Sequence, residues 1–265
     1  MTFKDEFYLD EKDGLTFFRS SNLSAKHIFS TRLGGVSTES HLSSLNLNSD
    51  RGDRDENVAE NLRRFTRVLG SDTDHFVSAS QVHSTDIRIV DISDAGRHFY
   101  AIDGFITREK GIVISVSIAD CAPILLEDPN RRIIGALHAG WRGTASGIAA
   151  KGVDIFRSLG SDIRDIRVAI GPCIHACCYE VGADFYESVL SLQGEKFSNK
   201  YVKAGKNGAF YADIAAMNCS LLLDAGISFE NISVCSRCTC CENELFFSHR
   251  ASHGLRGTMK AAIVL

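Results

Sequence analysis

The sequence predicts a mixed α/β protein in which helices flank a central mixed β-sheet. Short apolar runs typical of strands recur along the chain, between segments that have the three- and four-residue spacing of helices. The 265 residues, 44% hydrophobic and 23% charged, have the composition of an ordinary globular protein. Because no repeat, low-complexity tract or Ser/Pro-rich linker interrupts them, we expect a single domain over residues 1–265.

The clearest helix is expected over residues 53–70. Asp53 and Glu56 have the spacing of a capping box, and Gly70 supplies a C-terminal stop. The apolar residues that share one face of this helix are Val58, Leu62, Phe65 and Leu69. Further helices are expected over 143–160, around 183–193 and around 212–225.

Strands are expected where short apolar runs are bounded by turn residues. The segment 27–37 begins as a strand and breaks into a flexible loop at Gly34 and Gly35. In 111–120, branched residues alternate with smaller ones, as in a strand. The other expected strands are 76–83, 87–91, 131–140, 166–170, 230–234 and 261–265.

Charge and composition exclude several classes of function. A net charge of −4 offers no electrostatic footprint for a nucleic acid, so none is expected as a partner. The chain starts MTFKDEFYLD, without the features of a signal peptide, and no window approaches the roughly 18 apolar residues of a membrane span. We therefore expect a cytoplasmic protein whose nine cysteines are reduced thiols, some of them metal ligands.

Three strand-like segments end in a side chain that can bind a metal. FVSASQVHST contains His83, ISVSIADCAP contains Cys121, and IIGALHAGWRG contains His138. Neighbouring strand ends meet at one edge of a sheet, so we expect these side chains to converge there, with Pro123 stiffening the turn after Cys121. Two imidazoles and a thiolate are zinc ligands, and a three-ligand set leaves the fourth position for water or substrate. The alternative is a pair of structural histidines and a small buried thiol.

The segment HAGWRGT predicts an anion site beside these residues. A strand, a glycine turn and a helix start present free backbone amides for phosphate, and Arg142 adds a guanidinium. Arg32 in STRLGG is a second candidate for binding phosphate, and Asp120 is a candidate for contacting substrate or orienting a ligand histidine. The alternative is that the glycines make a tight turn, the arginines are solvated and Asp120 forms a turn.

Four further cysteines lie close together near the C-terminus: Cys235, Cys238, Cys240 and Cys241. Their C-x2-C spacings suit a structural zinc, with Cys173, Cys177 or Cys178 as additional ligands. Adjacent cysteines such as 240 and 241 do not easily bind one ion, so we expect buried thiols, with a second metal as the alternative.

The same segments resemble those of the laccase-domain family, whose members are also called polyphenol oxidases, purine nucleoside phosphorylases or peptidoglycan editing factors. The resemblance runs from about residue 27 to the C-terminus. It rests on FSTRLGGVS, GDRDENVAEN, QVHSTDI, IDGFIT, IADCAPILL, GALHAGWRGT, AIGPCIHACCYEVG and CTCCENELFFSHR. HAGWRGT, ADCAP and GPC…CCYEVG are together far more specific than any one of them alone.

The resemblance implies that His83, Cys121 and His138 are the metal-binding, catalytic residues, on a fold shared with cysteine deamidases of the cytotoxic necrotising factor type. It implies an enzyme with two activities: phosphorolysis of adenosine, inosine, guanosine and S-methyl-5′-thioadenosine, and deamination of adenosine. The implied partners are purine nucleosides and phosphate, and the implied cofactor is Zn²⁺. Copper-dependent phenol oxidation is an alternative, disfavoured because a His2Cys set without further copper ligands does not build a multicopper cluster.

Two other functions stay open on the sequence. A metal-free hydrolase would use Cys121 as nucleophile and His83 or His138 as base, for example to edit peptidoglycan precursors. A non-catalytic protein would store a metal or hold a partner through the same residues. The open three-ligand set argues against that role, because structural zinc sites normally have four protein ligands.

The chain departs from the family pattern at three places. Ser84 follows QVH where glycine is common, and Asn48 replaces the glycine of an SLNLG segment. The ending GTMKAAIVL lacks the arginine of the usual TGRMAA segment, and Lys260 or Arg256 are its candidate substitutes as anion ligands.

Overall fold

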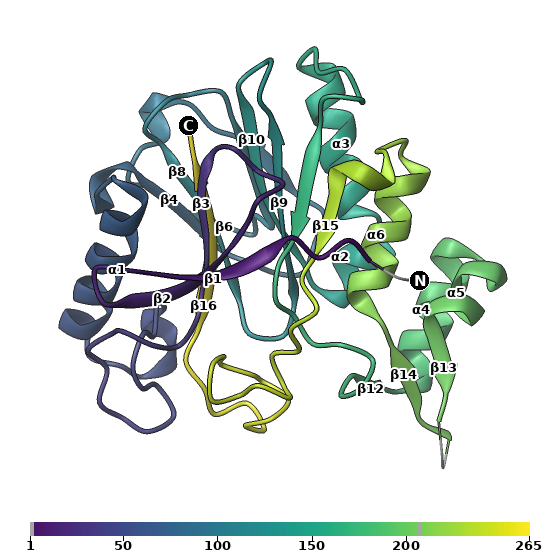
Figure 1. The fold of residues 1–265 in the computed structure, drawn as a ribbon. Coiled ribbons are helices and arrows are strands. Elements are labelled where there is room, and N and C mark those ends of the chain that lie inside the picture. Colours follow the sequence, from purple (N-terminus) through teal and green to yellow (C-terminus); the bar gives the residue numbers. More distant parts are fainter. Residues whose placement is uncertain (1–2, 206–207) are drawn as a thin grey trace.

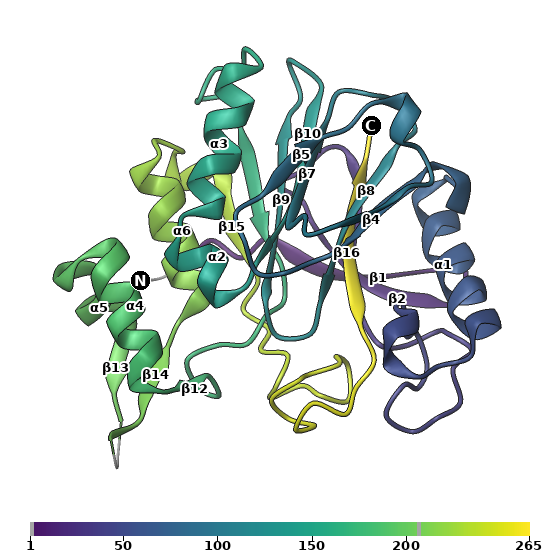
Figure 2. The ribbon, with the colours of Figure 1, turned by 180° about the vertical axis from the view of Figure 1, so that it is seen from behind.

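Two β-sheets packed face to face form the centre of the computed structural model, which describes residues 3–205 and 208–265 (Figures 1 and 2). The first sheet consists, in spatial order, of β1 (Phe7–Lys12), β2 (Leu15–Ser20), β3 (Lys26–Ser30), β16 (Met259–Val264), β8 (Val113–Ile118), β4 (Phe76–Ser80) and β6 (His98–Tyr100). The second consists of β15 (Ile232–Val234), β11 (Arg167–Ile170), β9 (Ala122–Asp128), β10 (Ile133–Ala139), β7 (Gly104–Thr107) and β5 (Ile87–Ile89). Both sheets are mixed, because β4–β8, β4–β6, β11–β15 and β5–β7 pair in parallel.

The side chains of strand β16 alternate between the two faces of the first sheet, and both faces are covered. Ala261 and Ile263 lie in the apolar core between the two sheets, whereas Ala262 and Val264 lie in the cluster under helix α1 (Asp55–Leu69). Because both faces of this strand are buried, all six of its residues are buried, Lys260 included.

Helices α3 (Ile148–Ser158) and α6 (Ile214–Asp224) cover the outer face of the second sheet. Leu125 of β9 faces the first sheet, and its neighbour Leu126 packs with Phe156 of α3 and Leu222 of α6. The order of layers is therefore helix, sheet, sheet, helix (Figure 1). The mixed α/β class predicted from the sequence is confirmed, and the expected central sheet is divided into two.

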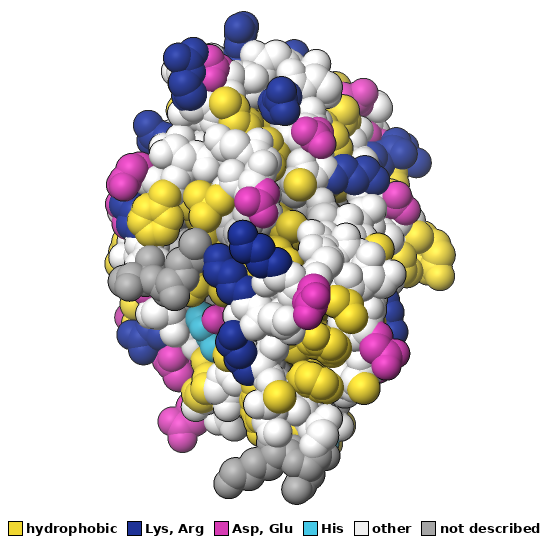
Figure 3. Space-filling view, turned by 90° about the vertical axis from the view of Figure 1, so that its right-hand side faces the viewer, with side chains coloured by type: hydrophobic (Ala, Val, Ile, Leu, Met, Phe, Trp, Pro, Cys, Tyr) yellow, Lys and Arg dark blue, Asp and Glu magenta, His cyan; other side chains and the backbone are white. Residues whose placement is uncertain are grey.

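A smaller unit lies beside α6, at the right of Figure 1. It contains a three-stranded sheet in the order β12 (Glu180–Val181), β14 (Phe210–Ala212) and β13 (Val202–Ala204), with helices α4 (Ala183–Gln193) and α5 (Glu195–Tyr201). Its apolar residues pack with those of α6 and of the short helix α2 (Trp141–Ala145). Figure 3 looks onto this side of the molecule, where positive and negative side chains are interspersed.

The predicted capping box of the first helix is wrong. Helix α1 starts at Asp55, one residue later than an N-cap at Asp53 predicts, and its N-cap Arg54 makes no side-chain capping bond. The carboxylate of Asp53 instead accepts hydrogen bonds from Ser37 Oγ and Asn46 Nδ2, so it ties together the loops before the helix. The predicted stop is confirmed, because Gly70 adopts a left-handed conformation with φ 78°.

Three other expectations differ from the structure. The helix expected over 143–160 is divided into α2 and α3, because Gly147 adopts the left-handed conformation with φ 81°. Pro123 lies inside β9, opposite His138 of β10, so it does not form the turn after Cys121. The strand expected over 76–83 ends at Ser80, which places His83 in a loop. Among the described residues, no helix is long and apolar enough to cross a bilayer.

Candidate metal centre

Three side chains meet where the ends of the two sheets come together. His83 lies in the loop after β4 of the first sheet, and Cys121 lies where the chain crosses from β8 of the first sheet to β9 of the second. His138 is the sixth residue of β10. Their ligand atoms all lie within 4.8 Å of one another. The sequence predicts this convergence at one edge of one sheet, but the structure places it between two sheets. We call these three residues the triad.

The position of His83 depends on a glycine in another segment. A Cβ atom at Gly140 would lie 2.3 Å from Cδ2 of His83, so only glycine leaves room for the imidazole. His83 itself adopts a left-handed backbone conformation with φ 63°. Its ring centroid lies 4.9 Å from that of His138, with the rings 75° apart. The glycine of HAGWRGT that the sequence assigns to an anion turn thus gives space to a triad histidine.

The carboxylate of Asp103, which is fully buried, holds both histidines in place. Its Oδ1 contacts Nδ1 of His138 at 2.8 Å and accepts the backbone N–H of His83 at 3.0 Å. Its Oδ2 accepts the backbone N–H and the hydroxyl of Ser84, each at 2.9 Å. Burial raises the pKa of Asp103, but the hydrogen bonds from His138 and Ser84 lower it to about 2, so the carboxylate is ionised. No sequence pattern predicts these contacts of Asp103, although the residue lies in the IDGFIT segment.

In the triad, the pKa values of one thiol and one imidazole are shifted from their ordinary values. The Cys121 Sγ lies 3.7 Å from Nε2 of His83. Burial raises the pKa of Cys121, but the charges of and hydrogen bonds to His138 and His83 lower it to about 6. Burial lowers the pKa of His138, but the Cys121 thiolate and the Asp103 carboxylate raise it to about 9.

The donor set fits a zinc-type ion. Because Nδ1 of His138 is bonded to Asp103, its Nε2 is the nitrogen left for a metal. Nε2 of His83 faces the Cys121 sulfur, and a thiol with a lowered pKa is readily ionised for metal binding. Three such atoms within 4.8 Å leave one tetrahedral position for water or substrate.

The triad lies in the wall of a cavity of about 610 Å³. Three cationic side chains, from Arg51, Arg256 and Lys260, also line this cavity, and none has an ion-pair partner within the described residues. Nζ of Lys260 donates to Ser117 Oγ at 2.8 Å, and burial lowers the pKa of Lys260 to about 8. Nε of Arg256 is buried without an acceptor in the described part of the chain. The cavity wall therefore combines candidate metal ligands with three cationic side chains and one acidic residue, Asp50.

Arg32 lies away from this cavity. Its guanidinium donates to the backbone carbonyls of Ser43, Ser40 and Asn243 and lies 4.6 Å from the ring centroid of Phe247. It lines a second cavity of about 410 Å³, which has Arg256 in common with the first. Its donors therefore hold two loops together and do not point to the triad.

Arg142 and Asp120 also lie outside the cavity wall. The Arg142 guanidinium stacks over the ring of Trp141 at 4.1 Å, on the exposed side of helix α2. The Asp120 carboxylate accepts hydrogen bonds from Thr239 Oγ1 and the backbone N–H of Arg250, both at 2.7 Å. Asp120 therefore holds the segment that contains Thr239 and Arg250 beside Cys121, and Asp103 occupies the position next to His138.

Comparison with known proteins finds relatives along almost the whole chain. The purine nucleoside phosphorylase YlmD of Geobacillus stearothermophilus is 36% identical over 241 residues, which cover 88% of this chain and 87% of that protein. A purine nucleoside phosphorylase of Deinococcus radiodurans is 35% identical over 252 residues, 95% of this chain and 94% of the relative. The adenosine deaminase RL5, from an unknown prokaryotic organism, is 33% identical over 229 residues, 84% of this chain and 87% of RL5.

Solved structures agree with these matches. The hypothetical protein YfiH of Bacillus licheniformis superposes with a TM-score of 0.90 at 33% identity, over 97% of this chain and 98% of YfiH. The model of the family named multi-copper polyphenol oxidoreductase laccase matches residues 26–265. This chain therefore belongs to that family, the laccase-domain family that its sequence motifs resemble.

Proposed function

We propose that this protein is a zinc-dependent purine nucleoside phosphorylase that also deaminates adenosine. The observation that carries the proposal is an open three-ligand set in the wall of a cavity that also holds three cations without ion-pair partners in the described residues. Two relatives named purine nucleoside phosphorylase and one named adenosine deaminase support it. The proposed substrates are adenosine, inosine, guanosine and S-methyl-5′-thioadenosine, with phosphate as the second substrate.

Phosphorolysis requires a phosphate on one face of the ribose C1′ atom and a leaving purine on the other. The cavity has room for both, since pockets of roughly 300–1,000 Å³ accept small organic ligands. We assign phosphate binding to Arg256 and Lys260, with Arg51 adding positive charge, because all three face the cavity. The geometry favours them over Arg32 and Arg142, which do not line it.

The triad would bind the metal, and Asp103 would hold the triad in position. His83, Cys121 and His138 are the proposed ligands, and a zinc ion held by them would supply Lewis-acid chemistry for deamination at the purine C6 position. Asp103 fixes the tautomer of His138 and the loop that carries His83, so the ligand geometry is formed in advance.

A nucleoside panel assayed with and without phosphate tests the proposal on purified protein whose zinc and copper have been quantified. Phosphorolysis releases the free base and a ribose 1-phosphate only when phosphate is present, whereas deamination of adenosine yields inosine without phosphate. We expect His83→Ala and Cys121→Ala to reduce both activities to background. His75→Ala and Cys240→Ala are matched controls outside the triad and should retain both activities. Wild-type rates in folded His83→Ala or Cys121→Ala would contradict the assignment.

A second function, a metal-free cysteine hydrolase, is favoured by one specific observation. The low pKa of Cys121 beside the raised pKa of His138, which Asp103 orients, describes a thiolate–imidazolium pair of the kind that nucleophilic hydrolases use. Its substrate would be an amide such as a peptidoglycan precursor. Activity that survives complete removal of metal and is lost on alkylation of Cys121 would favour this hydrolase. Restoration of nucleoside cleavage by added zinc would favour the phosphorylase.

A further inference from the structure

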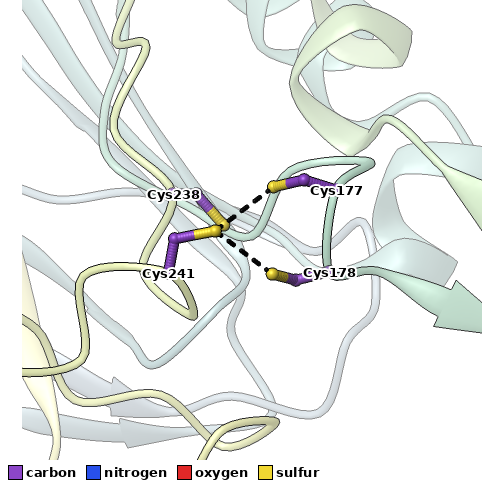
Figure 4. Close-up of side chains that lie close together, drawn as sticks. All are labelled: Cys177, Cys178, Cys238 and Cys241. Carbon is purple, nitrogen blue, oxygen red and sulfur yellow. Dashed lines mark hydrogen bonds between the residues drawn. The ribbon is translucent and has the colours of Figure 1, made fainter.

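Four thiols that the triad does not use meet between two loops far apart in the sequence. Two come from the turn at 175–179 after β11, and two come from the segment 235–258, which we call the C-terminal loop. Their sulfur atoms lie within 4.8 Å of one another, and Figure 4 shows the side chains pointing toward one another. We call this set the cysteine cluster: Cys177, Cys178, Cys238 and Cys241.

The distances within the cluster match those around a tetrahedral zinc ion. Sγ of Cys241 lies 3.5 Å from that of Cys177 and 3.3 Å from that of Cys178 (Figure 4). Four sulfurs at about 2.3 Å from a zinc ion lie about 3.8 Å from one another, so small movements suffice to place an ion between them. All four are free thiols in the structure.

We propose that the cysteine cluster binds one structural Zn²⁺ that joins the two loops. A set of four cysteines closes the coordination shell, which is the pattern of a structural site, whereas the triad leaves one position open. Two of the ligands, Cys238 and Cys241, have C-x2-C spacing. The backbone N–H of His175 also points at the sulfur of Cys238, at 3.4 Å, and would stabilise a metal-bound thiolate there.

Adjacent cysteines do not easily bind one ion, and the pair that the sequence places together, Cys240 and Cys241, does not meet in the cluster. Cys240, which the sequence groups with Cys241, lies outside the cluster and packs against the apolar core. The adjacent pair that does reach the cluster is Cys177 and Cys178, in a tight turn where two successive backbone N–H groups donate to the carbonyl of His175. The side chains of this pair approach Cys241 from the same loop (Figure 4).

Hydrogen bonds that need no metal already hold the two loops of the cluster next to each other. Thr239 N–H donates to the carbonyl of Cys173 at 3.0 Å, so the C-terminal loop pairs with the chain just before the turn. Asp120 joins the same segments, since its backbone carbonyl accepts Ile174 N–H at 2.8 Å and its carboxylate accepts Thr239 Oγ1 at 2.7 Å. A zinc here would therefore stabilise the loops next to Cys121 and the loop that supplies Arg256 to the cavity.

Metal analysis of variants separates this site from the triad. Protein purified with added zinc and freed of excess metal should lose one equivalent of zinc in the Cys177→Ser/Cys241→Ser variant. Cys240→Ser is the matched control and should keep the wild-type zinc content. His83→Ala should lose a different equivalent, so failure of the triad assignment leaves the test of the cluster intact. Equal zinc content in wild type and the double variant would overturn the proposal.

A second measurement uses wild-type protein and so does not depend on how the variants fold. Cys177 and Cys241 are exposed, so iodoacetamide should label them unless a metal holds their sulfurs. Burial and the contact with Cys241 raise the pKa of the Cys177 thiol, so the labelling is carried out at alkaline pH, where more of the thiol is ionised. We expect protection of both in zinc-loaded protein and rapid labelling after chelation, read by peptide mass spectrometry, together with a lower Tm. Cobalt added to chelated protein should give the intense absorption of a tetrathiolate site. Labelling that zinc does not slow, or a disulfide between cluster residues in reduced, zinc-loaded protein, would overturn the proposal.

Discussion

Asp103 contacts Nδ1 of His138 at 2.8 Å with the same carboxylate oxygen that accepts the backbone N–H of His83. One buried side chain, just before strand β7 of the second sheet, thus sets both the tautomer of one triad histidine and the backbone position of the other. Its remaining oxygen accepts two hydrogen bonds from Ser84, so the loop after β4 is wrapped around it. The spacing of the two imidazoles therefore depends on a residue that contacts neither the cavity nor the proposed metal.

Replacing Asp103 by asparagine should weaken metal binding without removing a ligand. The amide of the variant would turn an N–H₂ group toward hydrogen-bond donors that the carboxylate now satisfies, so the Ser84 loop and His138 would lose their fixed orientation. We expect a loss of roughly 10- to 100-fold in zinc affinity, measured by competition with a chromogenic chelator. Asp86→Asn changes an exposed carboxylate nearby and should bind zinc as wild type does. Unchanged affinity in Asp103→Asn would show that the carboxylate does not position the triad.

Gly140→Ala should displace His83. The added methyl group would lie 2.3 Å from the imidazole Cδ2, a distance that side chains do not tolerate, so the ring must rotate away from Cys121. We expect zinc content and nucleoside cleavage to fall toward those of His83→Ala, while circular dichroism shows a folded protein. Gly182→Ala is the control, because its nearest neighbour is the end of the exposed, flexible Asp184 side chain. A Gly140→Ala protein with full zinc content would disprove the steric argument.

The strands that the sequence reveals are those whose residues are buried on both faces. Strand β10 lies between two neighbouring strands and two apolar layers, so all seven of its residues are buried and it reads as a continuous apolar run. Strand β1 at the edge of the first sheet is largely exposed and has no such pattern, and the three-stranded sheet consists of two- and three-residue strands. These short strands depend on their neighbours, which local pattern does not show.

The sequence predicts the triad for a similar reason: His83, Cys121 and His138 each follow or end a recognisable apolar run. The sequence predicts the phosphate ligands less well, and Arg32 shows why. A carbonyl is present in every residue, so no motif shows that Ser40, Ser43 and Asn243 bring theirs to the guanidinium of Arg32. The sequence does indicate two of the cations that line the cavity. Lys260 and Arg256 lie in the segment that departs from the family pattern, where they are the candidate substitutes for the usual arginine.

Protonation of His27 should destabilise the protein below neutral pH. Nε2 of this buried side chain accepts the backbone N–H of Ser20 at 2.9 Å, which requires a neutral ring, and burial lowers its pKa to about 4. The unfolded chain has a histidine pKa of about 6.5, so between these values the unfolded state binds more protons and stability falls as pH falls. We expect this group to cost about 3 kcal/mol on acidification from pH 7 to pH 4.

Urea unfolding at several pH values checks the contribution of His27. The His27→Gln variant should be less stable than wild type at pH 7, because the hydrogen bonds to Ser20 and Ala25 change. Its stability should nevertheless fall less steeply between pH 6.5 and pH 4, so the two curves converge on acidification. Parallel curves would show that His27 is not the group that titrates.

Lys260 should make phosphate use depend on pH in the alkaline range. Burial lowers the pKa of its ammonium group to about 8, so the positive charge that it offers to the cavity is present below that pH and is lost above it. Phosphate becomes more completely the dianion over this range, and the added negative charge favours binding to a cation, so the ionisation of phosphate itself does not raise KM. We expect KM for phosphate to rise several-fold between pH 7.5 and pH 9 in wild type. Lys260→Arg keeps its charge and should show a flat profile, whereas Lys260→Met should have a high KM at every pH. A rise in KM that is the same in wild type and Lys260→Arg would assign the titration to another group and leave Arg256 as the cation that binds phosphate.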